Sequence, residues 1–372
     1  MNNSNEFPGV RIAALVAAVP DDYEQIMDYT DQFPEGELEK FCQTTGARER
    51  YVGANLKTTA SDLCVAAARE IFAHADIDKS TIDALIFLPQ RADYFVPPTS
   101  CVIQHRLGLD HCGLVYDSNI GCTGSIFGIQ MACANLMSDS KRVLVMVGDS
   151  EEGKGGKQQK NDLLFGSCGV AMVLERMAEA VSPIRMGLST IGKGYQVMIS
   201  PYGMVRHPLR MFYEDRGLDA VLDYANRIAK QGTYIFTFST KDAPRVAKEF
   251  LARFGCGIND YDLISINQAD KMIVDNVAKR VKAPAEKVLW SLDRYGNIGG
   301  ISMMINLCDY VQRENVHQGT KRVFNMAFGI GLNVAVADLT LDMGAVLPII
   351  KTTEVFDDGI DSFTFFAEEE KH

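Results

Sequence analysis

Residues 66–93 read AAAREIFAHADIDKSTIDALIFLPQRAD, and residues 246–270 read VAKEFLARFGCGINDYDLISINQAD. Each stretch has the pattern of a helix, a turn and an apolar strand that ends in a polar tip containing Gln. The segments that follow also match, since residues 99–124 and 274–300 both carry Asn-Ile-Gly near their ends. A period of about half the chain is too long for a solenoid. The repeat therefore predicts two homologous halves related by a pseudo-twofold axis.

A third pair of segments extends the repeat and gives the fold class. KRVLVMVGDS begins at Lys141 and KRVFNMAFGI begins at Lys321, and each reads as a strand that follows a helix. Strands that alternate with helices predict an α/β fold with mostly parallel sheets, covered by helices and joined by right-handed crossovers. A new strand-like run starts after Ser182-Pro183. We expect an N-terminal half at residues 8–180, a C-terminal half at 181–342 and an appended tail at 343–372.

Composition and charge narrow the class of protein. The chain has 372 residues, of which 47% are hydrophobic and 23% charged, as in a folded globular protein. The formal net charge of −11 opposes nucleic-acid binding. The apolar run from Ile12 to Val19 is too short for a membrane span and lacks the features of a signal peptide, so it predicts a first strand. We expect a cytoplasmic protein with no membrane association.

Nine cysteines occur without CxxC spacing. An odd number without that spacing argues against a disulfide framework or a zinc site, so we expect no metal. Most of these thiols are expected to be small buried hydrophobic side chains in a reducing compartment.

One cysteine has a special position, in the segment VYDSNIGCTGSIFGIQMACANLM at residues 115–137. Its first part reads as a strand, and its continuous apolar part from Thr123 predicts a helix buried on all sides. Cys122 then lies at the start of that helix, where unpaired amides and the helix dipole stabilise an anion. A thiolate there is a candidate nucleophile, and the surrounding amides are candidates to hold an oxyanion. The alternative is a structural thiol at a turn.

The repeat connects Cys122 with two asparagines of the second half. Asn297 takes nearly the place that Asn119-Ile-Gly-Cys takes in the first half, and Asn267 lies at a strand tip. Pseudo-symmetry brings both helix starts together, although each Asn also suits an ordinary turn or cap. His207, in VRHPLR, is a candidate base or, alternatively, a surface loop residue.

At these residues the sequence resembles the ketoacyl-acyl-carrier-protein synthase III family of the thiolase superfamily. The resemblance runs from Gly9 to about Leu341. Its anchors are TGARER from Thr45, TASDLCVAAA from Thr59, SNIGCTG from Ser118, RYGNIGG from Arg294 and AFGIGL from Ala327. It implies a duplicated thiolase-like fold with αβαβα layers and a fatty-acid or polyketide type of acyl transfer.

The resemblance also implies site residues. Carried over position by position, the family's Cys is Cys122 and its Asn is Asn297, and the backbone at Gly121 and Ile330 is expected to form the oxyanion turn. The family's His falls on Asn267. Because an Asn carries no charge and exchanges no proton near neutral pH, decarboxylative condensation is in question. Transfer to an oxygen, nitrogen or sulfur nucleophile, or a non-catalytic partner subunit, are the alternatives.

Donor and partners follow from the same resemblance. The Trp that stacks on coenzyme A would fall near Lys40, and the neighbouring arginine is Thr44 here, which favours a carrier-protein thioester over a coenzyme A thioester. No tightly bound cofactor is expected, only an acyl thioester as substrate. An acyl carrier protein is the expected transient partner, with a homodimer as the assembly. Three lysines of a short basic loop are candidate carrier contacts, or simply solvated: Lys154, Lys157 and Lys160.

Overall fold

Two mixed sheets form the frame of the protein in a computed structural model, which describes residues 3–53, 57–151, 159–178, 181–224 and 228–360. The first sheet has, in spatial order, β15 (Ile350–Thr352), β2 (Val10–Pro20), β8 (Cys168–Arg176), β7 (Arg142–Asp149), β5 (Ala84–Pro89) and β6 (Leu114–Asp117). The second has β1 (Asn3–Phe7), β9 (Ile184–Thr190), β14 (Asn333–Asp342), β13 (Thr320–Gly329) and β12 (Leu263–Ile266). Two small ribbons pair β3 (Tyr23–Gln25) with β4 (Glu49–Tyr51), and β10 (Met198–Ile199) with β11 (Ala229–Lys230).

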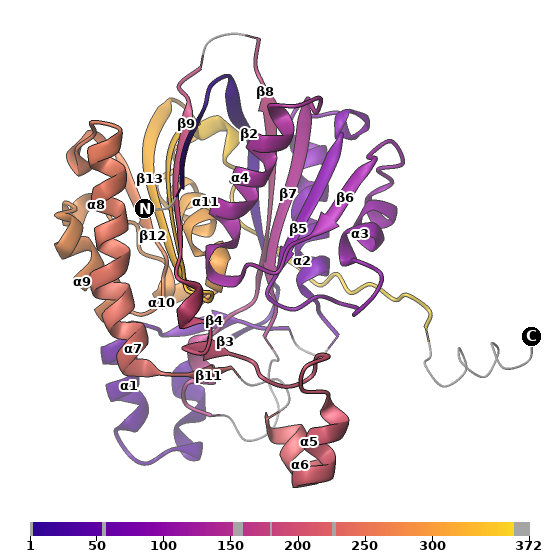
Figure 1. The fold of residues 1–372 in the computed structure, drawn as a ribbon, viewed down its shortest axis with the longest axis vertical. Helices are drawn as coiled ribbons and strands as arrows, with labels where there is room; N and C mark the ends of the chain where they lie inside the picture. Colours follow the sequence, from indigo (N-terminus) through magenta and orange to yellow (C-terminus); the bar gives the residue numbers. More distant parts are fainter. Residues whose placement is uncertain (1–2, 54–56, 152–158, 179–180, 225–227, 361–372) are drawn as a thin grey trace, which may run out of the picture.

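Helices cover both sheets and also separate them, which gives five layers (Figure 1). The first outer layer contains α2 (Ala60–His74) and α3 (Thr99–Leu107), and the other contains α8 (Ala243–Arg253) and α9 (Lys271–Val281). Between the sheets lie α4 (Gly124–Leu136) and α11 (Ser302–Glu314). The expected thiolase-like αβαβα fold is thereby confirmed. The remaining helices are α1 (Glu37–Thr45), α5 (Leu209–Arg216), α6 (Leu218–Tyr224), α7 (Gly232–Thr237) and α10 (Leu292–Tyr295).

Strand alternation divides the core among these layers. In β7, Val143 and Val145 face the central layer, whereas Leu144 and Met146 face the outer helix α2. Successive side chains of a strand point to opposite faces, so a strand buried on both sides must be apolar throughout. This is why both copies of the repeat contain uninterrupted apolar runs.

The expectation of mostly parallel sheets is wrong for β8 and β14, the strands that follow the repeated segments. β5, β6 and β7 are mutually parallel, as are β12 and β13. However, β7 pairs with β8 in antiparallel fashion, and β13 does so with β14. Only residues 330–332 separate β13 from β14, and a parallel connection needs a dozen residues or more. The short link forces a hairpin.

The two chain ends are exchanged between the halves. β1 joins the second sheet beside β9, although it precedes the first half in sequence. Conversely, β15 pairs with β2 of the first sheet, and the amide of Phe356 donates to Asp62 in α2. The segment after residue 343 is therefore more than the appendage we expected, at least as far as residue 360. The domain boundaries themselves stay a prediction.

Two helix predictions have different outcomes. Thr59 caps α2 by accepting from the Asp62 amide, and the Thr59 amide donates to the Asp62 carboxylate at 3.0 Å, which is the predicted capping box. The prediction that α4 is buried on all sides is wrong, because Phe127 and Met131 are only partly buried and Ala134 is exposed. One face of α4 lies at the surface of the chain.

The packing of α2 on the first sheet depends on glycine in β8. A Cβ at Gly169 would lie 2.4 Å from the backbone nitrogen of Cys64, closer than any real contact. We expect Gly169→Ala to lower the free energy of unfolding by about 1–3 kcal/mol, the usual cost of overpacking, in urea denaturation. Gly113→Ala is the matched control, because nothing lies within 4 Å of a Cβ there. Equal stabilities of the two variants would contradict this account of the layer.

Candidate active site

The two halves meet at a pair of short 3₁₀ turns. Residues Gly121–Thr123 lead into α4, and residues Gly299–Ile301 lead into α11. A Cβ at Gly300 would lie 2.4 Å from the carbonyl oxygen of Gly121, and Ser125 donates to the carbonyl of Gly300. The structure thus brings the two helix starts together, as the pseudo-symmetry predicts.

Cys122 lies in the first of these turns, against the end of β13. A Cβ at Gly329 would lie 2.7 Å from the Cys122 sulfur, so only glycine allows this approach. The backbone amides of Ile330 and of Cys122 itself lower the pKa of the Cys122 thiol, as donors close to the sulfur do. Two backbone donors therefore converge where the sequence predicted an oxyanion site. Gly121 has a φ of 71°, which favours glycine, and packs against Ile330.

The expectation of a stabilised Cys122 thiolate is not met. Burial raises the pKa of the Cys122 thiol, and the Asp149 carboxylate raises it further. The two amides and the Lys230 ammonium lower this pKa, but burial is the largest effect. The helix start does supply donors, yet removal of water from the sulfur outweighs them. The resting form is a thiol that must lose its proton in order to react.

Asn267 and Asn297 flank the same turns, with their amides already engaged. Asn267 is 3% exposed, and its Nδ2 donates to the carbonyl of Phe328 at 3.4 Å. Its Oδ1 has no hydrogen-bond partner among the residues that the structure describes. Asn297 donates to the carbonyl of Ala269 at 3.2 Å and accepts from the Gly299 amide at 3.0 Å. As oriented, Asn267 has a free acceptor oxygen, and one of its two N–H groups is committed to the backbone.

The other predicted residues lie elsewhere. His207 is exposed on the loop before α5 and faces the Tyr202 ring, with ring centroids 6.0 Å apart. This position fits a surface loop residue rather than a catalytic base. Lys154 and Lys157 lie outside the described residues. Lys160 forms an ion pair with Glu37, which partly neutralises its charge.

Two charged residues near Cys122 were missed in the sequence. Asp149 ends β7 and is 7% exposed, and Lys230 lies in β11 with its Nζ 4.1 Å from the Phe165 ring centroid. Both act on Cys122 through their charge. Part of the Lys230 side chain is open to solvent, yet the enclosure of its ammonium lowers its pKa. Asp149 could have been found from the sequence, because VMVGDS places a carboxylate at the end of an apolar strand.

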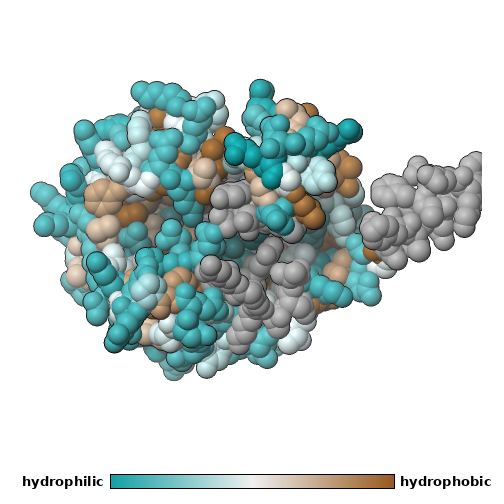
Figure 2. Space-filling model, turned by 90° about the horizontal axis from the view of Figure 1, so that it is seen from below, coloured by the Kyte–Doolittle hydropathy of each residue, from teal (hydrophilic) through white to brown (hydrophobic). Residues whose placement is uncertain are grey.

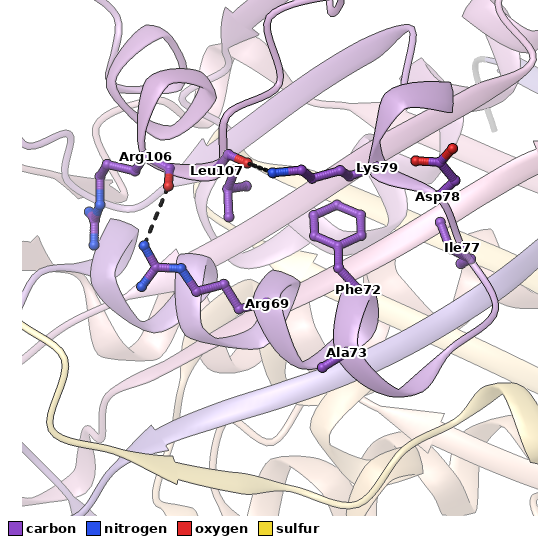
Figure 3. Close-up of a pocket in the computed structure, with 8 residues that line it drawn as sticks. All are labelled: Arg69, Phe72, Ala73, Ile77, Asp78, Lys79, Arg106 and Leu107. Carbon is purple, nitrogen blue, oxygen red and sulfur yellow. Dashed lines mark hydrogen bonds between the residues drawn. The ribbon is translucent and has the colours of Figure 1, made fainter.

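A hollow on the outer surface between α2 and α3 is unrelated to this site (Figure 3). Two of its cationic side chains bind carbonyl groups at the C-terminal end of α3. Arg69 donates to the carbonyl of Arg106, and Lys79 donates to that of Leu107 at 3.1 Å. Cations at a helix C-terminus are stabilising, so this hollow has a structural explanation. Among the described residues no cluster of His, Cys, Asp or Glu could hold a metal ion. No described helix is long and apolar enough to cross a membrane.

Comparisons with known proteins show which proteins this chain is similar to. Residues 251–340 match the model of the 3-oxoacyl-[acyl-carrier-protein] synthase III C-terminal domain. The beta-ketoacyl-[acyl-carrier-protein] synthases III of Clostridium perfringens and Fusobacterium nucleatum are 29% and 26% identical; the matches cover 82% and 84% of this chain and 93% and 90% of those proteins. The crystal structure of the 3-oxoacyl-(acyl-carrier protein) synthase from Burkholderia xenovorans superposes with a TM-score of 0.85 at 26% identity, over 94% of this chain and 99% of that one.

Over most of its length the chain is similar to 3-oxoacyl-[acyl-carrier-protein] synthases III, and residues 251–340 match the C-terminal domain of that family. This confirms the resemblance drawn from the sequence motifs. The roles of Cys122, Asn267 and Asn297, and the replacement of the family's His, stay predictions.

The opposing charges at Cys122 give a direct test of the site. Since the Lys230 ammonium lowers the pKa of the Cys122 thiol, we expect Lys230→Met to raise that pKa. Alkylation of Cys122 by iodoacetamide at pH 8, followed by peptide mass mapping, should slow by up to about tenfold, the effect of one pKa unit. Lys241→Met, outside the site, is the control. An unchanged alkylation rate would place Lys230 too far from the sulfur to matter.

Proposed function

We propose that this synthase III-like protein transfers an acyl group from a thioester to a second substrate, with Cys122 as the covalent carrier. The convergence of the Ile330 and Cys122 amides on the Cys122 sulfur is the observation that supports it best. In acylation a bond forms between Cys122 Sγ and the acyl carbon, the donor's carbon–sulfur bond breaks, and the leaving thiolate takes a proton. Backbone amides that meet at this point suit the tetrahedral oxyanion.

The family pattern for the second step is a Claisen condensation, with an acyl thioester of acyl carrier protein or coenzyme A as donor. One observation favours the other candidate, transfer to an oxygen, nitrogen or sulfur nucleophile. A decarboxylating malonyl thioester builds negative charge on its carbonyl oxygen and requires donors. Asn267 offers instead a free acceptor oxygen, and one N–H of each Asn side chain is already bound to a backbone carbonyl. A free acceptor suits an acceptor substrate that carries O–H or N–H.

A basic surface is available for an acidic carrier protein. With Lys160 paired to Glu37, the described part of the basic loop offers little free charge. A shallow hollow at α8 and α9 carries four cationic side chains and one acidic one. Arg245 pairs with Glu249 at 2.7 Å, and the remaining excess of positive charge favours an acidic partner. The lining residues of this hollow are Lys241, Pro244, Arg245, Lys248, Glu249, Ala252 and Arg280. Elsewhere, on the face in Figure 2, hydrophobic residues are interspersed with hydrophilic ones.

Mass spectrometry tests the covalent step. We expect wild-type protein incubated with acyl-coenzyme A or acyl-carrier-protein thioesters to gain the mass of the acyl group, and Cys122→Ala to gain none. Cys101→Ala, also a partly buried free thiol, is the matched control and should acylate normally. Acylation of Cys122→Ala to the same extent would exclude Cys122 as the carrier.

Restoring the family's histidine separates acylation from condensation. The acylation step makes no use of a proton-carrying group at position 267, so Asn267→His should leave the acyl-enzyme yield unchanged. The same variant should increase malonyl-dependent condensation, because a histidine donates to the developing enolate charge. If the native protein condenses malonyl thioesters rapidly and Asn267→His slows it, Asn267 is itself the adapted group.

We also propose a homodimer through the edge of the first sheet. β6 is the terminal strand, so its outer backbone groups are open to pairing, and Leu114 at its start is 44% exposed. Phe95 and Val96 are 71% and 72% exposed in the loop before α3, whose first amides bind Asp117 of β6. The partly open face of α4 adds apolar surface. A second copy would cover these residues.

Light scattering at micromolar concentration tests the dimer. The wild-type chain should have twice the monomer mass. Leu114→Asp should be monomeric but folded, because a charge at the start of β6 disfavours edge pairing and the side chain is already exposed. Met204→Asp, 61% exposed near α5, should stay dimeric. A monomeric wild type would contradict the proposal.

A further inference from the structure

Asp149 is a buried carboxyl group beside the nucleophile turn. It is 7% exposed, and its Oδ1 accepts from the Ser150 amide at 3.0 Å. A Cβ at Gly299 would lie 3.7 Å from its Oδ2, and one at Gly300 would lie 3.3 Å from the Cys122 carbonyl carbon. The carboxyl group therefore faces Gly299, which is next in sequence to the residue at which the second 3₁₀ turn meets the Cys122 backbone.

No cation neutralises Asp149 in the part of the chain that the structure describes, since no ion pair reaches it. The Arg91 charge does act on Asp149, but Arg91 pairs with Glu151 at 3.5 Å and donates to the carbonyl of Ser150. Burial raises the pKa of Asp149 to about 7, the Glu151 carboxylate adds to the rise, and Arg91 and the Ser150 amide oppose it. A carboxyl group that titrates near neutral pH is suited to proton transfer.

We propose that Asp149 is the proton-transfer group of this site, accepting the Cys122 thiol proton as the acyl–sulfur bond forms. The proton moves directly or through one bridging water. When the tetrahedral intermediate collapses and the donor's carbon–sulfur bond breaks, Asp149 returns the proton to the leaving thiolate. No oxidant or reductant is needed. The inference rests on the proposed acyl transfer and assigns a residue to its proton.

The neighbouring groups are less suited to this role. Asn267 cannot accept a proton near neutral pH. Glu151 is paired with Arg91, and its side chain is 30% exposed. Lys230 is a cation whose charge already favours the thiolate, so its loss of a proton would weaken that effect. Asp149 alone combines burial, the absence of a described ion pair and an electrostatic effect on Cys122.

Two rates measured on the same variant separate proton transfer from simple electrostatics. Removing the Asp149 charge lowers the pKa of Cys122, so Asp149→Asn should speed iodoacetamide alkylation of Cys122 at pH 7.5, by up to about tenfold. The same variant should slow single-turnover acylation by acyl-coenzyme A about 100-fold, because general-base catalysis is lost. An electrostatic role alone speeds both reactions, and a folding defect slows both.

The pH profile is the second readout. Wild-type acylation should rise through about pH 7 and level off as Asp149 loses its proton. In Asp149→Asn that inflection should vanish, and the rate should instead follow the thiolate fraction upward with pH. Glu151→Gln is the matched control: loss of the Glu151 charge should move the inflection to lower pH and leave the plateau rate unchanged.

The possible failures are distinguishable. If wild-type protein forms no acyl-enzyme with any thioester, the proposed function fails. If the wild type acylates and Asp149→Asn keeps both its rate and its pH inflection, only the assignment of Asp149 fails. Should Asp149→Asn not fold, a wild-type acylation profile without an inflection between pH 6 and 8 overturns the assignment by itself.

Discussion

The contact between the two 3₁₀ turns is the constraint on which the rest of the site depends. Gly300 can accept no side chain, since a Cβ there would lie 2.4 Å from the Gly121 carbonyl oxygen and 2.8 Å from the Gly124 nitrogen. The turns must touch, because each leads into one of the two helices that lie between the sheets, α4 and α11. Gly329 adds a third close approach, which holds the end of β13 against Cys122. The nucleophile is thus fixed by backbone on two sides.

Much of the fold could be predicted from the repeat, because both copies carry the apolar pattern that the same packing requires. The paired apolar runs, the capping box at Thr59 and the meeting of Cys122 with the Asn297 turn could all be inferred from the chain. Strand direction could not. The β13–β14 hairpin depends on a three-residue link whose conformation the apolar pattern does not encode, and the strands at the chain ends pair with the opposite half. The pairings of β1 and β15 depend on contacts distant in sequence.

The electrostatics of the site was less predictable than its geometry. A cysteine at a helix start predicts a stabilised thiolate, but the prediction omits how much water the fold removes from the sulfur. Asp149 and Lys230 lie 27 and 108 residues from Cys122 in sequence, and nothing local to either indicates proximity. Their effect on the thiol arises only when β7 and β11 arrive at the same turn. Burial and long-range charge are properties of the assembled fold.

The charges around Cys122 also limit which protonation states are possible. A thiolate at Cys122 and a carboxylate at Asp149 are like charges in a poorly solvated space, so each raises the cost of the other. Burial opposes both anions, and Lys230 offsets only part of that opposition on the sulfur. The pair is therefore most stable with a single proton between them, on the sulfur or on the carboxyl group. In the first state the thiol is inert toward a thioester, and in the second it is nucleophilic. Movement of one proton would then switch the site without any change in its backbone.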